Sequence, residues 1–209
     1  MAVLPSLATV ADLAATLGRT FTPEQEAQAQ ALLDQASSIV RAYVRLDITR
    51  ATTTDTFPMR RSDRQHLGAP FDHARHGQVT LPQRPVEEVA TVKVNGTVTH
   101  DWWVEQNELF LRSVPWLGPP GAHQAPRVEV TYTHGWSPVP GDIQAIVLQA
   151  ANRVIVNPSG IRSETVGGVS TTYLIPATGE NLGVLLSRTE MRVLDRYRRT
   201  ASSVRLRSV

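Results

Sequence analysis

The chain has 209 residues, of which 41% are hydrophobic, and its formal net charge is +2. This length and composition indicate a globular protein with one sizeable core, or a core and a small additional domain, and exclude a disordered or fibrous chain. The absence of cysteine excludes disulfides and thiolate catalysis, and the absence of any run of roughly 18 apolar residues gives no sign of a membrane partner or of export.

Two helices are predicted near the amino terminus. Thr9 and Asp12 have the spacing of a capping box and Gly18 supplies a stop, which predicts a short helix over 10–17. A second capping box, at Thr22 and Gln25, precedes apolar residues that recur at helical spacing from Ala29 to Val44 and predict a helix that begins at Pro23. A long amphipathic helix of this kind needs a partner surface.

The pattern changes over residues 50–135. Six short stretches are rich in β-branched or aromatic residues and are separated by turn signals: ATTTDTF, QVTL, VEEVATVKV, TVTHDWWV, ELFLR and RVEVTYTHG. We interpret this region as a small, mostly antiparallel β domain inserted between helices. Within it, residues 60–77 have no periodicity and are interpreted as a loop.

A further helix is predicted over 141–156, with apolar residues over so broad an arc that it should be central and covered on two sides. The sequence SETVGGVSTTY follows, and it predicts a β-hairpin over 161–174 with its turn at Gly167 and Gly168. Neither face of this hairpin is apolar enough for an ordinary core face. We therefore expect the hairpin to pack against something outside its own sequence neighbourhood.

The carboxyl-terminal end is basic. Seven arginines and two acidic residues fall between Arg188 and Val209, so this segment carries +5. A capping box at Ser187 and Glu190 predicts a last helix with four arginines along one side: Arg188, Arg192, Arg196 and Arg199. The tail over 200–209 then alternates apolar and basic residues in a strand-like pattern. Three interpretations stay open for the tail: addition to the sheet edge of another protein, contact with nucleic acid phosphates, or disorder.

No constellation of residues indicates catalysis. His66, His73 and His76 lie near Asp63 and Asp72, but their spacing matches neither HExxH nor a Cys/His finger, which favours solvated loop histidines. No hydrolase elbow, phosphate loop or dinucleotide motif is present. The four tryptophans have no basic stripe among them, which favours packing over a stacking platform for bases. We expect no catalytic, cofactor-binding or metal site, and a protein that is not an enzyme.

Together these elements predict an α+β fold. Residues 1–49 and 136–209 form a helical bundle, residues 50–135 form the inserted small antiparallel β domain, and a late β-hairpin precedes the C-terminal helix. No internal repeat or low-complexity block interrupts this order.

Three stretches resemble one known family, the head-to-tail connector (adaptor) proteins of long-tailed bacteriophages and related gene-transfer particles. The most specific is VTYTHGWSPVPGDIQAIVLQAANRVIVNPSGIRSETVGGVSTTY, in which a helix ending in NPSG precedes a Ser-Glu-x-x-Gly-x-x-Ser hairpin. The others are VADLAATLGRTFTPEQEAQAQALLDQASSIVRAY and LLSRTEMRVLDRYRR. The resemblance covers the helical framework, about half of the chain, and the long β insertion over 50–135 departs from the compact members of the family.

The resemblance implies a structural protein of the virion neck, assembled in the host cytoplasm. It implies a ring of about twelve copies beneath the portal protein, which extends the channel for double-stranded DNA without sequence-specific binding and receives the next neck component, a stopper or the tail. The C-terminal segment typically docks on the portal, which here points to Arg192, Arg196, Arg199, Val204, Arg205, Leu206 and Arg207. Contacts within the ring, or the channel wall, are expected at Glu164, Thr165, Val166, Gly167, Gly168, Val169 and Ser170.

Two alternatives belong to other classes. A DNA-binding module would use the arginine-rich C-terminal helix against phosphates, with an affinity that falls steeply as salt rises. An enzyme would require a site in the β insertion around His66, His73, His76 and Asp72. Metal analysis of the purified protein would decide the second alternative.

Overall fold

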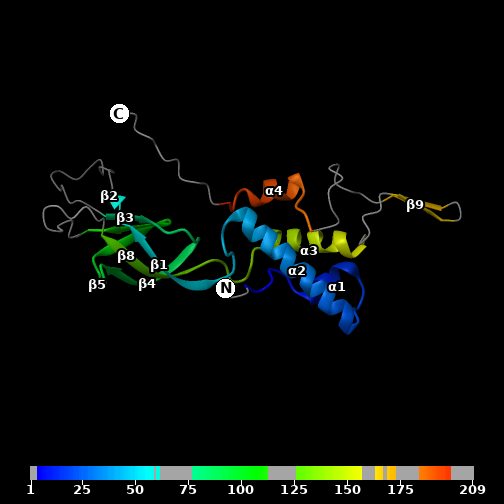
Figure 1. Cartoon of the computed structure of the whole chain (residues 1–209), viewed down its shortest axis with the longest axis horizontal. Helices are drawn as coiled ribbons and strands as arrows, with labels where there is room; N and C mark the ends of the chain where they lie inside the picture. The colour runs from blue at the N-terminus through cyan, green and yellow to red at the C-terminus, as the bar shows by residue number, and fades with distance from the viewer. Residues whose placement is uncertain are drawn as a thin grey trace, which may run out of the picture. The chain divides into compact units, whose positions relative to one another are not determined.

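The computed structural model divides the chain into two compact units (Figure 1). The first unit combines Met1–Asp47 with Pro138–Val209, and the second is Ile48–Ser137. Helices and antiparallel sheets are both present, which confirms the predicted α+β class. The residues that the structure describes are 4–58, 60–61, 77–112, 126–156, 163–166, 169–172 and 184–198.

Two capped helices open the first unit. α1 (Val10–Leu17) begins at the capping box of Thr9 and Asp12 and ends at Gly18, whose φ of 62° lies in the left-handed region. α2 (Pro23–Val44) begins at a second capping box. α1 has the predicted bounds and α2 the predicted start, because side chains at the capping positions satisfy N–H groups that the first turn leaves without a partner.

α3 (Gly141–Val156) is the central helix of this unit and contacts α1, α2 and α4. Its buried side consists of apolar residues: Ile143, Ile146, Val147, Ala150 and Ala151. α4 (Arg188–Leu194) packs on α2 and α3, and in Figure 1 it lies on the opposite side of α3 from α1. The prediction of a central helix covered on two sides is confirmed.

The second unit contains two four-stranded antiparallel sheets. The first has the order β1-β8-β4-β5, with β1 at Ala51–Pro58, β8 at Arg127–His134, β4 at Val86–Val94 and β5 at Thr97–Thr99. The second has the order β2-β3-β7-β6, with β2 at Arg60–Arg61, β3 at Gly77–Thr80, β7 at Glu108–Leu111 and β6 at Trp102–Glu105. β2 and the start of β3 shorten the predicted loop at both ends, and residues 62–76 lie outside the described residues.

The two sheets are joined at both edges. β1 and β5, at the edges of the first sheet, are followed along the chain by β2 and β6, at the edges of the second. The stretch TVTHDWWV is therefore two strands, of which β5 pairs with β4 and β6 with β7. Because the chain passes directly from one sheet to the other at both edges, we call this unit the barrel.

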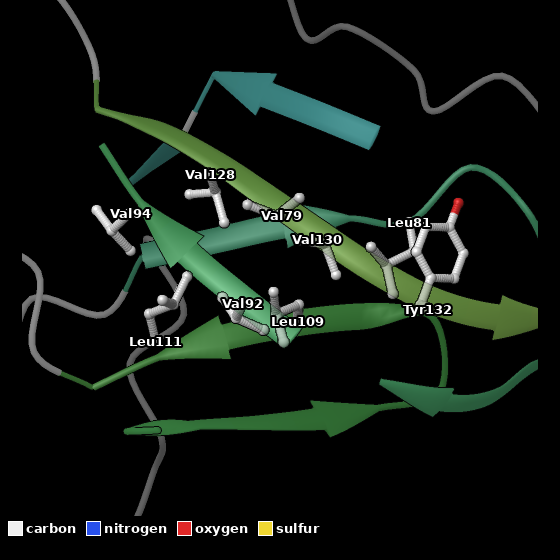
Figure 2. Close-up of a cluster of buried hydrophobic side chains, with 9 residues drawn as sticks. All are labelled: Val79, Leu81, Val92, Val94, Leu109, Leu111, Val128, Val130 and Tyr132. Atoms are coloured by element: carbon white, nitrogen blue, oxygen red, sulfur yellow. The ribbon is translucent and has the colours of Figure 1, made fainter. Parts of the chain in front are cut away.

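An apolar core fills the barrel. Side chains alternate along β8, and Val128, Val130 and Tyr132 are fully buried. Figure 2 shows them beside buried residues from both sheets: Val79, Leu81, Val92, Val94, Leu109 and Leu111. The Tyr132 hydroxyl donates to Asp55 Oδ2 at 2.9 Å, so the one polar atom of this group is satisfied.

The first and last residues of the barrel unit are hydrogen-bonded to each other. The Trp136 N–H donates to the Ile48 carbonyl at 2.8 Å, and the Trp136 carbonyl accepts from the Arg50 N–H at 3.0 Å. This close approach requires glycine at position 135, where φ is +90° and a Cβ would lie 2.4 Å from the Thr49 carbonyl oxygen. The chain therefore enters and leaves the barrel at one place.

Candidate assembly interface

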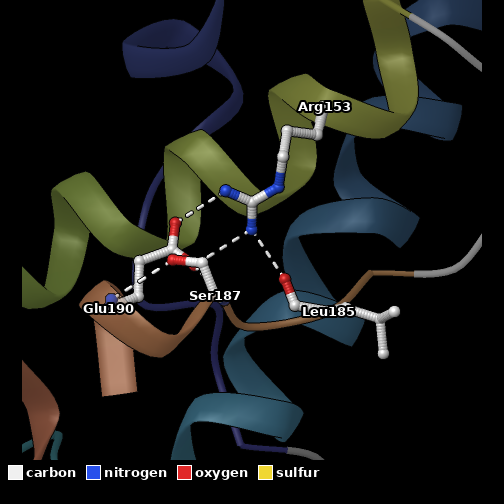
Figure 3. Close-up of polar contacts among 4 residues, drawn as sticks. All are labelled: Arg153, Leu185, Ser187 and Glu190. Carbon is white, nitrogen blue, oxygen red and sulfur yellow. Dashed lines mark hydrogen bonds and ion pairs between the residues drawn. The ribbon is translucent and has the colours of Figure 1, made fainter. Parts of the chain in front are cut away.

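The start of α4 is fastened to α3 by Arg153. The Arg153 guanidinium donates to both carboxylate oxygens of Glu190, at 2.7 and 3.1 Å, and to the Leu185 carbonyl at 2.6 Å (Figure 3). The Ser187 N–H donates to Glu190 at 2.7 Å and the Glu190 N–H donates to Ser187 Oγ at 3.2 Å, which confirms the predicted capping box. We call these four residues the Arg153 anchor.

The Arg153 anchor keeps Glu190 ionised. Glu190 is only 6% exposed, and this burial by itself would raise its pKa. The hydrogen bonds from Arg153 and from Ser187 outweigh burial and hold the pKa of Glu190 below its ordinary value of 4.5. Loss of Arg153 would leave the buried Glu190 carboxylate without an opposite charge, so replacing Arg153 should destabilise the contact between α3 and α4.

Tyr43 holds the turn that follows α4. Its hydroxyl donates to Asp195 Oδ1 at 2.6 Å, and the Arg198 guanidinium lies 5.1 Å from the centre of the Tyr43 ring. The hydrogen bond to Asp195 raises the pKa of Tyr43, because ionised tyrosine could no longer donate. The turn over 195–198 is thereby tied to α2.

Asp142, in the first turn of α3, binds the same turn from a second side. Its carboxylate accepts from the Tyr197 hydroxyl at 2.9 and 3.0 Å and forms an ion pair with Arg196. Burial and the bond to Asp142 both raise the pKa of Tyr197. Asp142, Arg196 and Tyr197 form what we call the Asp142 anchor.

The predicted arginine stripe is interrupted at Arg196. α4 ends at Leu194, so Arg196 lies in the turn, where it pairs with Asp142. The helical placement of Arg196 is wrong, because α4 ends before this residue. Arg188 and Arg192 are exposed on α4. The other predicted docking residues lie outside the described residues: Arg199, Val204, Arg205, Leu206 and Arg207.

The predicted hairpin is present. β9 (Ser163–Val166) pairs with β10 (Val169–Thr172) in antiparallel register, with Val166 opposite Val169. This register leaves a two-residue connection, as a tight hairpin requires. Gly167 and Gly168, which make up this connection, lie outside the described residues, and their role in a ring or channel wall stays a prediction.

Two of the tryptophans have packing partners in the barrel. Trp103 stacks on Phe110 with ring centres 5.0 Å apart, and the Arg112 guanidinium lies 5.5 Å from the centre of the Trp103 ring. Trp102 packs against the barrel core. These contacts support the packing interpretation over a stacking platform for bases.

The described residues hold no group of three His, Asp or Glu side chains that could bind a metal ion. The histidine-rich stretch, with His66, His73, His76, Asp63 and Asp72, lies outside the described residues. Within the described ranges, no helix combines the length and the hydropathy that crossing a membrane requires.

Sequence reasoning found the capping box and named Arg196 as a docking residue, but it missed the tertiary contacts that Arg153, Asp142 and Tyr43 make. The position of Arg153 could have predicted an acidic partner, because a cation on a helix that is apolar over a broad arc suggests a nearby carboxylate. Asp142 looked like an ordinary acidic residue in a first helical turn. Tyr43 carried no signal, since its partner Asp195 is 152 positions away in the sequence.

No protein-family model and no curated protein matches the chain. Its fold is similar to that of a chain in the virion of a native gene transfer agent particle, with a TM-score of 0.54 and 17% identity over 95% of this chain and 92% of that chain. It is also similar to a chain in the neck of an empty gene transfer agent particle, a structure computed with C6 symmetry, again with a TM-score of 0.54 and 17% identity, over 100% of this chain and 97% of that chain. At this identity the likeness shows a shared fold.

Proposed function

We propose that this chain is a structural neck protein of a phage-like particle, a head-to-tail connector that forms a ring of about twelve copies beneath the portal protein. The observation that carries the proposal is the fold, which the chain shares over its full length with a chain of a gene transfer agent neck. The ring would extend the DNA channel without sequence-specific binding and would receive the next neck component or the tail. The chain would act in the virion after assembly in the host cytoplasm, and not as an enzyme.

The two anchors support portal docking by the C-terminal segment. They fasten the chain before and after α4, so Arg192 projects from a helix whose ends are both tied to the rest of the unit. We assign docking to Arg192 together with Arg199, Val204, Arg205, Leu206 and Arg207. The alternation in the tail suits addition to a sheet edge of the portal, with arginines meeting carboxylates. Arg196 belongs instead to the Asp142 anchor, and the β9–β10 hairpin is our candidate for contacts within the ring.

Imaging and mass measurement with the portal protein test the proposal. The purified chain should form a ring of about twelve copies on the portal in negative stain and native mass spectrometry. A stable monomer beside the portal contradicts the connector function. Deleting residues 200–209 should abolish portal binding while leaving thermal unfolding unchanged, and a truncated chain that still joins the portal contradicts the docking assignment.

The DNA-binding alternative makes a different quantitative prediction. Contact of Arg188 and Arg192 with two phosphates gives a slope of log K against log salt of about −2, whereas a continuous stripe of four arginines gives about −4. Only these two arginines are exposed on α4, so we expect weak duplex binding with the shallow slope. Tight binding with the steep slope would favour the DNA-binding module.

A further inference from the structure

A strained residue stands where the chain passes from the helical unit into the barrel. Ile48 is the first residue of the barrel unit, and its φ of 66° lies in the left-handed region. A β-branched side chain disfavours this region, because its branches crowd the backbone. Such a conformation persists only where the surrounding contacts hold it. We call residues 45–48, which lead from the end of α2 into the barrel, the crossing segment.

Hydrogen bonds hold the backbone on both sides of Ile48. The Asp47 carbonyl accepts from Arg41 Nε at 2.9 Å, and the Ile48 carbonyl accepts from the Trp136 N–H at 2.8 Å. These two bonds fix the planar peptide groups before and after Ile48, and φ and ψ of Ile48 describe how these two planes are turned. The positive φ is therefore imposed by Arg41 from one side and by Trp136 from the other.

Arg41 has a second acceptor, at the start of the chain. Its Nη2 donates to the Pro5 carbonyl at 2.5 Å, and Arg41 as a whole is only 9% exposed. The donors of a guanidinium form a rigid fork, so a change at one acceptor alters the placement of the other donors. The Pro5 carbonyl thus helps to hold Arg41 in the position from which it binds Asp47.

Side-chain contacts hold the first described residues, 4–8, on α2. These residues, which we call the N-terminal segment, belong to no helix or strand. The Ser6 hydroxyl donates to Asp34 Oδ1 at 2.5 Å, and the Leu7 N–H donates to Ser37 Oγ at 2.9 Å. A segment held in this way opens at a lower free energy than a packed helix or a paired strand.

We propose that Arg41 is a latch that couples the N-terminal segment to the crossing segment. While the N-terminal segment lies on α2, Arg41 binds Asp47 and keeps Ile48 strained. When the N-terminal segment is displaced, Arg41 loses the Pro5 carbonyl and releases Asp47, so Ile48 relaxes to a negative φ. Because the chain enters and leaves the barrel at one place, this change at a single residue lets the barrel turn as a body. The latch does not depend on the proposed ring.

Paired substitutions at position 48 test the strain. Ile48→Ala and Ile48→Gly differ only in the Cβ, so at a positive φ the glycine variant should have the higher urea midpoint. Leu46 is the matched control, since it is 2% exposed and its φ is not positive. There the alanine variant should have the higher midpoint. In an Arg41→Met background the order at position 48 should revert to that at position 46, and an order that does not revert overturns the latch.

A distance between the two units gives the second readout, on the full chain. Because the chain has no cysteine, Gln28→Cys on α2 and Thr97→Cys on β5, both exposed, each accept one spin label. Arg41→Met should shift or broaden the distance distribution, and so should deletion of residues 2–6, which removes the Pro5 carbonyl. Arg19→Met, which removes an exposed arginine of the same unit, is the control and should leave the distribution unchanged.

Hydrogen exchange of α3 and β8 amides should stay unchanged in these variants, because each unit keeps its own fold. Arg41→Lys keeps the charge but not the fork, so it should act like Arg41→Met. An unchanged distance distribution in Arg41→Met overturns the latch. A change in Arg41→Met but not after the deletion overturns the coupling to the N-terminal segment. Loss of α3 protection in both Arg41 variants would assign this residue a general role in stability and overturn the latch as well.

Discussion

The helical unit and the barrel are stabilised by different kinds of interaction. In the helical unit, Arg153 and Asp142 make charged contacts with residues far along the chain. Their partner helix α4 has only seven residues, which is too short to be stable without tertiary contacts. In the barrel, paired strands surround an apolar core with few charges. Changes of charge should therefore release α4 selectively, whereas the barrel should fail when its backbone or its core is disturbed.

Gly135→Val should have the largest effect, because it places a branched side chain against the Thr49 backbone at a positive φ. We expect a loss of more than about 3 kcal/mol in the free energy of unfolding of the barrel, measured by urea denaturation. Gly96→Ala is the matched control, since Gly96 also has a positive φ, of +86°, but open space around it. It should cost about 1 kcal/mol, and equal losses in the two variants would contradict the close-approach argument.

Leu109→Ala should have the second largest effect on stability, since Leu109 is fully buried between the two sheets. The cavity and the lost burial should together cost about 3 kcal/mol. Hydrogen exchange gives the measurement: amides of β4, β7 and β8 should lose protection while amides of α3 keep theirs. An equal loss of protection in α3 would show that the two units unfold together, and would contradict the separate stabilisation of the helical unit and the barrel.

Arg153→Met should have the next largest effect, because it leaves the buried Glu190 carboxylate without its cation. We expect it to destabilise the packing of α4 by about 2 kcal/mol. The loss should appear as faster hydrogen exchange in α4, with the barrel unchanged. Arg188→Met, at an exposed position of α4, is the control and should have little effect. The double variant with Glu190→Met should recover part of the loss, and an additive result would contradict the direct coupling of Arg153 and Glu190.

Acid should have the mildest effect, limited to α4. The pKa of Glu190 is lower in the folded chain, so the stability it contributes is fully present above its ordinary value of 4.5 and is lost as the pH falls through the folded value. Exchange of α4 amides should therefore accelerate below about pH 4.5 before that of β8 amides. Glu190→Gln should remove this part of the pH dependence, and an unchanged profile would assign it to other carboxylates.

Much of the fold could be predicted because its signals are local. Thr9 and Asp12 are three positions apart, and their capping box set the start of α1 correctly. The β-branched and aromatic residues of RVEVTYTHG identified β8. Gly167 and Gly168, between two β-branched runs, predicted the pairing of β9 with β10. In each case the residues that decide the structure are neighbours in the chain.

The candidate interface was less predictable. Periodicity continued the last helix through Arg196, but α4 ends at Leu194, and Asp142 binds Arg196 and Tyr197 in the turn that follows. The β-rich stretch TVTHDWWV contains two strands, and these strands belong to different sheets. Asp142 lies 54 positions before Arg196 in the sequence, and no local pattern shows that the two residues meet.

The sequence by itself determined the helix starts and the strand alternation, since capping and amphipathicity act within one or two helical turns or a few strand positions. It also excluded cysteine chemistry. The pairing order of the two sheets and the two anchors required the folded chain. Hydrogen bonds and ion pairs form between whichever groups the fold brings within reach, and sequence separation sets no limit on that reach. Where α4 ends, and which arginines stay exposed, are therefore properties of the tertiary structure.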